Sequence, residues 1–170
     1  RIRSVRLLPE HSKALGAAVE AIHSADMIVL APGSLYTSII PNLLVDGIAD
    51  AIRDSKALKL YVCNVMTQEG ETEGYTVSDH IQALFSHSYP GLFRLCLTNS
   101  TPIPEVIALR YAQEGAEPIR HDVEKCRALG VELIDRPVAA LENGLVRHNP
   151  GHLAHELMTI YEEYKPKDPA

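Results

Sequence analysis

No apolar stretch of this sequence approaches the roughly 18 residues that a membrane-spanning helix requires, so the sequence excludes a membrane span. Lysine and arginine do not cluster into a stripe and the formal net charge is −6, so we do not expect a nucleic-acid partner. The first residues show no signal-peptide pattern. The three cysteines are widely spaced and form no CxxC or other thiol–metal motif. Such usage is typical of reduced, buried thiols, and we therefore expect a cytoplasmic protein.

The common catalytic and phosphate-binding motifs are missing as well. The sequence contains neither GxGxxG nor GxxxxGK[ST], so it has no self-sufficient phosphate-binding fingerprint. It also contains no GxSxG, no Cys–His signature and no HExxH, which leaves the catalytic residues unknown. Asp79-His80 could form an acid–base pair, but adjacent helix residues point in different directions. A helix cap followed by an interior histidine is the better interpretation of that pair.

Strand-like and helix-like segments alternate along the chain. Weak alternation at residues 2–8 suggests an edge strand. Short apolar runs predict strands at residues 27–31, 58–65, 93–98, 131–135, 137–141 and 145–148. Helical spacing, first-turn prolines and terminal glycines predict helices at residues 9–24, 41–55, 76–87, 104–113, 121–129 and 151–164. Thr76-Val-Ser-Asp79 predicts a capping box at the start of one of these helices. The alternation indicates one α/β domain over residues 1–170, with a mostly parallel sheet, a hairpin and a final helix.

Polar loops follow two consecutive predicted strands, at residues 31–38 and 64–75. Because the carboxyl ends of parallel strands meet at one edge of a sheet, these loops predict a shared ligand site. In the first loop, Gly33 permits a tight turn whose backbone amides and hydroxyls could bind an anion or a sugar. The hydroxyls are those of Ser34, Thr37 and Ser38. An ordinary strand-to-helix turn explains the same residues without any ligand.

The second loop carries amide and hydroxyl side chains suited to the polar edges of a nucleobase or a sugar. They are those of Asn64, Thr67 and Gln68. A solvated surface loop is the alternative interpretation. The three glutamates of this loop would repel phosphate unless a divalent cation intervened.

Three further features lie closer to the carboxyl terminus. Arg147 could bind phosphate in a forked geometry, or could form an exposed ion pair. Tyr111 could stack on a base, or could pack against a neighbouring element. His148, His152 and His155 resemble a metal-ligand cluster, but Pro150-Gly151 separates the first from the other two, so we expect no metal site there.

Several near-verbatim segments resemble the gluconeogenesis factor family, the YvcK-like proteins of bacteria, which are related to 2-phospho-L-lactate transferase (CofD-like proteins). The dense resemblance spans residues 26–87, and weaker agreement that includes Arg147-His148 extends it over most of the chain. The segments that carry it are Pro32–Val45, Tyr61–Gln68, Gly70–Thr72, Gly74–Thr76 and Asp79-His80.

The resemblance implies a Rossmann-like, three-layer α/β fold that binds a nucleotide, with a UDP-sugar such as UDP-N-acetylglucosamine as the expected ligand. It also implies a regulatory protein, rather than an enzyme, with a role in carbon-source use and in cell-shape or cell-wall maintenance. Chemistry placed on the matched positions predicts a ligand contact for each candidate. Gly33, Ser34 and Asn42 would line the diphosphate and sugar, followed by Asn64, Thr67 and Gln68; Tyr111 would stack on uracil and Arg147 would bind phosphate.

Two other functions remain open at this stage. The transferase branch would move a phospho-organic-acid group from a nucleotide carrier to a deazaflavin, with a divalent cation such as Mg²⁺ as its cofactor. A module that acts only through protein contacts would need no ligand, and a homodimer is compatible with any of the three.

The sequence departs from the family pattern in two respects. Nothing matches the Gly-rich, GGGTG-like turn with which family members open, so the chain resembles only the C-terminal half of such a protein. The first residue is Arg1 rather than methionine, and we expect a fragment of a longer CofD/YvcK-like protein. Ala31 and Glu69 also replace an expected glycine and an expected proline.

Overall fold

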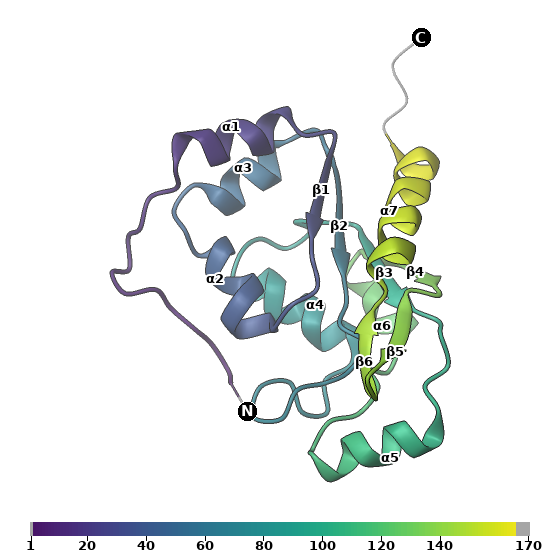
Figure 1. Ribbon diagram of the computed structural model, residues 1–170. Coiled ribbons are helices and arrows are strands. Elements are labelled where there is room, and N and C mark those ends of the chain that lie inside the picture. The colour runs from purple at the N-terminus through teal and green to yellow at the C-terminus, as the bar shows by residue number, and fades with distance from the viewer. Residues whose placement is uncertain (1, 166–170) are drawn as a thin grey trace.

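The parallel sheet predicted from the sequence is present. In the computed structural model, which describes residues 2–165, four parallel strands pair in the order β1-β2-β3-β4 (Figure 1). They are β1 (Met27–Leu30), β2 (Leu58–Val62), β3 (Leu95–Asn99) and β4 (Glu132–Arg136). Because neighbouring strands are parallel, their carboxyl ends share one edge of the sheet, the lower edge in Figure 1.

Helices connect these strands, and a separate antiparallel hairpin follows the last of them. The hairpin consists of β5 (Ala139–Glu142) and β6 (Leu145–His148). The helices are α1 (Gly16–Ser24), the π-helical turn η1 (Leu35–Ile39), α2 (Ile40–Leu43), α3 (Ile48–Asp54), α4 (Val77–Ser86), α5 (Glu105–Gln113), α6 (Val123–Ala128) and α7 (Pro150–Tyr164). Over residues 2–165, no helix combines the length and the hydropathy needed to cross a bilayer.

Both faces of the sheet are covered. Alternate side chains of each strand point to opposite sides, and residues of the helices pack against them on each side. Tyr61 of β2 packs into a large core cluster with residues of α2, α3, α4 and α6. Its neighbours Leu60 and Val62 instead join a second cluster that contains Ile160 of α7. The predicted three-layer α/β fold, with its hairpin and final helix, is therefore confirmed.

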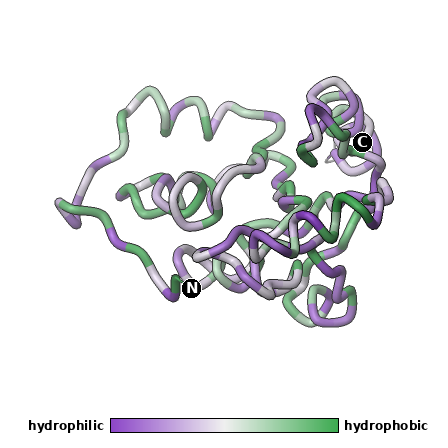
Figure 2. Tube along the Cα trace, turned by 60° about the horizontal axis from the view of Figure 1, so that its bottom comes forward, coloured by the Kyte–Doolittle hydropathy of each residue, from purple (hydrophilic) through white to green (hydrophobic). Residues whose placement is uncertain are grey.

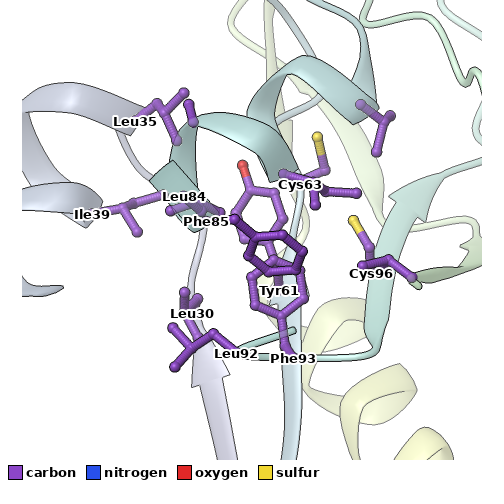
Figure 3. Close-up of a cluster of buried hydrophobic side chains, with 14 of the residues drawn as sticks. Leu30, Leu35, Ile39, Tyr61, Cys63, Leu84, Phe85, Leu92, Phe93 and Cys96 are labelled. Atoms are coloured by element: carbon purple, nitrogen blue, oxygen red, sulfur yellow. The ribbon is translucent and has the colours of Figure 1, made fainter. Parts of the chain in front are cut away.

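Aromatic rings and thiols fill the centre of the larger cluster (Figure 3). The rings of Tyr61 and Phe93 lie 5.7 Å apart between centroids. Cys63, Cys96 and Cys126 are all free and buried, as predicted. Burial raises the pKa of the Cys126 thiol to about 12, so this thiol is an unreactive core side chain.

Helix α4 begins with the predicted capping box. The Asp79 carboxylate accepts a hydrogen bond from the backbone N–H of Thr76 at 2.8 Å, and the Thr76 hydroxyl completes the reciprocal contact. His80 is fully buried, its Nδ1 lies 2.9 Å from the carbonyl oxygen of Thr76, and burial lowers its pKa. Asp79-His80 is thus a cap followed by an interior histidine.

Asp122 ties the start of α6 to the start of α4. Its carboxylate accepts hydrogen bonds from the Ser78 backbone N–H at 2.9 Å, the Ser78 hydroxyl at 2.5 Å and the Thr76 hydroxyl at 2.8 Å. Partial burial raises the pKa of Asp122, but these bonds outweigh it and hold the pKa below its ordinary value. The sequence offered no signal for this contact across 44 residues.

Three predicted elements differ from the structure. Residues 2–8 form no strand: Ile2 and Val5 pack against the core by their side chains, and Figure 2 shows this segment as an arc of alternating hydropathy. The single helix expected at residues 41–55 is instead η1, α2 and α3, because the chain turns at Gly47 with a left-handed φ of 97°. The helix expected at residues 9–24 begins only at Gly16. The tail after residue 165 lies outside the described residues.

Candidate functional site

A pocket of about 470 Å³ lies at the carboxyl edge of the sheet. Residues that follow β1 and β2 form one side, while α5 and the hairpin form the other. Seven of the predicted ligand contacts line it, namely Gly33, Ser34, Asn64, Thr67, Gln68, Tyr111 and Arg147. The structure therefore brings together residues that lie more than a hundred positions apart in the sequence.

The other three candidates lie elsewhere. Ser38 and Asn42 line a different, mainly apolar pocket of about 360 Å³ between β1 and the helices that follow it. The Asn42 amide there donates a hydrogen bond to the Ser38 carbonyl oxygen at 2.6 Å. Thr37 is exposed and does not line the larger pocket. The hydroxyl-rich loop after β1 is thus divided between two surfaces.

Asn64 holds the two strand-end loops together. Its Nδ2 donates to the Gly33 carbonyl oxygen at 2.9 Å, and its Oδ1 accepts from the Gly33 backbone N–H at 3.3 Å. Gly33 and Asn64 are therefore direct neighbours, as expected if the two loops form one shared ligand site. Both polar atoms of the Asn64 amide are already engaged, so this residue shapes the pocket wall.

Gln68 presents the clearest unsatisfied group of the pocket. Its Nε2 donates to the Ser34 hydroxyl at 3.0 Å, whereas its Oε1 is buried and has no hydrogen-bond partner among the described residues. Thr67 beside it is buried, and its hydroxyl accepts from the Glu117 backbone N–H at 2.8 Å. A buried acceptor without a partner is costly, so a ligand that donates a hydrogen bond to Gln68 Oε1 would be favoured.

Two backbone amides of the turn after β1 already have side-chain partners in the second loop. The Gly33 N–H is bonded to Asn64, and the Tyr36 N–H donates to the buried Glu71 carboxylate at 3.0 Å. A negative charge at this position disfavours a phosphate beside the turn. The anion-binding role of the remaining amides and hydroxyls of this loop stays a prediction.

Arg147 offers the alternative position for a phosphate. It lies on β6, lines the pocket and is exposed. The ion pairs of the described residues do not include Arg147, so the exposed ion pair considered for it is not observed. An unpaired guanidinium can form two parallel hydrogen bonds to a phosphate.

His148, which was not among the ligand contacts predicted from the sequence, lines the same pocket. Burial lowers the pKa of His148, although the nearby Cys63 carbonyl opposes this effect. Its Nε2 is buried and has no hydrogen-bond partner among the described residues. A neutral imidazole beside Arg147 adds a polar group without adding charge.

The described residues do not form a ready-made cation site. Within residues 2–165, no group of three or more His, Cys, Asp or Glu side chains is arranged to hold a metal ion. Of the loop glutamates, Glu71 accepts from Tyr36, and Glu73 accepts from the Gly70 backbone N–H at 2.8 Å. These carboxylates are engaged in shaping the loop, so they do not fit the divalent cation that the transferase branch implies.

Tyr111 joins α5 to the hairpin. Its hydroxyl accepts a hydrogen bond from the Val146 backbone N–H at 2.9 Å, and its ring packs against a small core cluster with Val65 and Met66. Tyr111 therefore has the packing role considered for it, while part of its surface still lines the pocket.

Replacing Tyr111 with phenylalanine should lower the free energy of unfolding by about 1 to 2 kcal/mol, because the Val146 N–H loses its acceptor. The ring and its packing remain, so only the hydrogen bond is tested. Urea unfolding followed by circular dichroism gives the change, and Tyr161→Phe on α7 is a matched control. Equal stabilities of Tyr111→Phe and the control would contradict this role.

Comparisons with known proteins agree with the resemblance inferred from the sequence. The family model described as 2-phospho-L-lactate transferase CofD matches residues 1–139. The chain is 45% identical over 158 residues to a "Gluconeogenesis factor" of Halalkalibacterium halodurans, and 41% identical over 163 residues to a "Gluconeogenesis factor" of Bacillus subtilis. These matches cover 93% and 96% of the chain but 49% and 51% of the relatives.

A solved structure shows the same fold. A crystal structure of a protein from Bacillus halodurans superposes with a TM-score of 0.89 at 45% identity, covering 92% of this chain and 50% of that one. The chain thus spans about half the length of the relatives it matches. Family model, relatives and fold agree, and the chain belongs to the CofD family, as a homologue of its gluconeogenesis factor members.

Proposed function

We propose that this chain contributes to binding a nucleotide sugar, with a UDP-sugar as the ligand, and acts as a regulatory protein rather than as an enzyme. The observation that carries the proposal is the pocket, which is lined both by Arg147, whose guanidinium has no ion-pair partner among the described residues, and by Gln68, whose buried Oε1 has no hydrogen-bond partner there. The first group suits a phosphate, and the second requires a donor such as a base N–H or a sugar hydroxyl. A nucleotide sugar carries both kinds of group.

We infer the cellular role from family membership. Relatives named gluconeogenesis factor support a link to carbon-source use, and the same proposal includes a role in cell-shape or cell-wall maintenance. A protein that reports the level of a nucleotide sugar could connect carbon supply with wall synthesis, because such sugars are products of the first and substrates of the second.

A phospholactate-transferase-like enzyme is the second candidate. The description of the matched family model favours it, since residues 1–139 fit a model named for that transferase. Its nucleotide carrier would occupy the same pocket. The unfavourable fit of the loop glutamates to a divalent cation places this reaction second.

An NMR titration of the ¹⁵N-labelled chain separates these functions, because it detects affinities as weak as millimolar. We expect UDP-N-acetylglucosamine to shift the amide signals of residues that line the pocket, with a dissociation constant of about 1 mM, since the chain spans half of its relatives. GDP should shift them less, and buffer alone should not shift them.

Two outcomes would contradict the proposal. Preferential binding of GDP together with turnover of a deazaflavin acceptor would establish the transferase. No shift with any nucleotide at 10 mM (about ten times the expected dissociation constant) would leave a module that acts through protein contacts.

A further inference from the structure

A second pocket adjoins the first at the carboxyl edge of the sheet. Its volume is about 370 Å³, and it shares the lining residues Asn64 and Val65 with the first pocket. Its remaining wall comes from the segment after β3 and from the segment that leads into α6. The two pockets thus lie next to each other along the ends of β2 and β3.

An oriented histidine lines the second pocket. The Nδ1 of His121 lies 3.0 Å from the Asp135 Oδ1, and the same carboxylate oxygen accepts a hydrogen bond from the Thr98 hydroxyl. The contact with Asp135 fixes the orientation of the imidazole. The Nε2 of His121 has no hydrogen-bond partner among residues 2–165, so it is available to a ligand.

A buried hydroxyl without a partner lines the same pocket. Thr101 Oγ1 is buried and forms no hydrogen bond with the described residues. The backbone of Thr101 is held on both sides by the Asn99 side chain, which accepts from its N–H at 3.0 Å and donates to its carbonyl at 2.9 Å. The backbone of Thr101 is therefore held in place, and its buried hydroxyl lacks a partner among the described residues.

The charges of the two pockets differ. The first contains the Arg147 guanidinium, whereas no lysine or arginine lines the second, and the Asp135 carboxylate lies behind His121. A phosphate is therefore favoured in the first pocket and disfavoured in the second. Ile103 and Ile119 give the second pocket an apolar wall, which suits the apolar face of a sugar ring.

We propose that the second pocket holds the neutral sugar of the nucleotide sugar, with His121 and Thr101 binding its hydroxyl or amide groups. This inference rests on the proposed function and extends it by specifying how the ligand is oriented across the two pockets. The phosphates lie beside Arg147, and the sugar lies across Asn64 and Val65, above the ends of β2 and β3.

The test compares UDP with UDP-N-acetylglucosamine, which differ by the sugar. Wild-type chain should bind the sugar nucleotide more tightly than UDP. Thr101→Val and His121→Phe should each weaken UDP-N-acetylglucosamine binding about three- to tenfold in NMR titrations, through loss of one hydrogen bond, and should leave UDP binding unchanged. Thr159→Val and His155→Phe on α7 are matched controls, expected to change neither affinity.

The outcomes separate this inference from the proposed function. Equal binding of UDP and UDP-N-acetylglucosamine by the wild-type chain, or equal weakening of both by the two variants, would overturn the sugar position while nucleotide binding stands. Failure of both ligands to bind the wild-type chain would overturn the inference together with the proposed function. Amide spectra that retain the wild-type dispersion establish that each variant is folded.

Discussion

Replacing Asp122 with alanine should lower the free energy of unfolding by about 3 kcal/mol. The carboxylate accepts three hydrogen bonds from Ser78 and Thr76, and its side chain is only 18% exposed. Removing it leaves the Ser78 N–H and hydroxyl without this acceptor, although the Thr76 hydroxyl can still donate to Asp79, and it releases α6 from α4. Urea unfolding followed by circular dichroism at neutral pH measures the loss.

Asp26→Ala is the matched control for this substitution. Asp26 is exposed, and its carboxylate forms no hydrogen bond or ion pair with the described residues, so its removal should change the free energy of unfolding by no more than about 0.5 kcal/mol. If Asp122→Ala were no more destabilising than Asp26→Ala, the proposed tether between α4 and α6 would be wrong.

Lowering the pH should remove the stabilisation that the Asp122 carboxylate provides. Because the pKa of Asp122 is lower in the folded protein than in the unfolded chain, ionised Asp122 contributes its full stability above a pH of about 4. That contribution is lost as the pH falls from about 4 through the lower pKa of the folded protein. The difference in unfolding free energy between wild type and Asp122→Asn should therefore be smaller at pH 3 than at pH 6. A difference that does not change with pH would contradict the assigned cause.

Replacing Arg147 with alanine should raise the dissociation constant for UDP-N-acetylglucosamine about tenfold or more, because a charge-assisted hydrogen bond to phosphate is lost. The guanidinium lines the pocket and has no carboxylate partner among the described residues, so its removal breaks no internal ion pair. The effect should therefore appear in binding and not in stability. NMR titration measures the dissociation constant, and urea unfolding measures the stability of the same variant.

Two further variants make this test specific. Arg94→Ala removes an exposed arginine remote from the pocket residues and should leave the dissociation constant unchanged. Arg147→Lys keeps the charge but loses the forked geometry, so it should recover only part of the affinity. An unchanged constant for Arg147→Ala would remove this residue from the site.

The elements that could be predicted from the sequence are those with local physical causes. The capping box at Thr76 and Asp79 depends on residues three positions apart, and it forms as expected. The strands at the centre of the sheet follow from continuous apolar runs. The failures have non-local causes: residues 2–8 alternate like a strand, but a strand requires a paired neighbour, which sequence spacing does not supply.

The candidate site likewise has features that the sequence predicts and features that depend on non-local contacts. Residue types alone selected Asn64 and Gln68, but only the structure shows that the first is engaged by Gly33 while the second keeps a free acceptor. Glu71 was noted only as one of three loop glutamates that would repel phosphate, yet it is buried and accepts a hydrogen bond from the Tyr36 N–H. His148 was considered only as a metal ligand, although it lines the same pocket as Arg147.

By itself, the sequence determined the α/β class, the family and the edge of the sheet at which polar side chains gather. These depend on apolar periodicity, near-verbatim segments and the common direction of parallel strands. The tertiary structure decided which of those polar groups line one pocket and which form hydrogen bonds with one another. That outcome depends on hydrogen bonds between distant segments, such as Asn64 to Gly33 and Tyr111 to Val146, whose partners come into contact only when the chain folds.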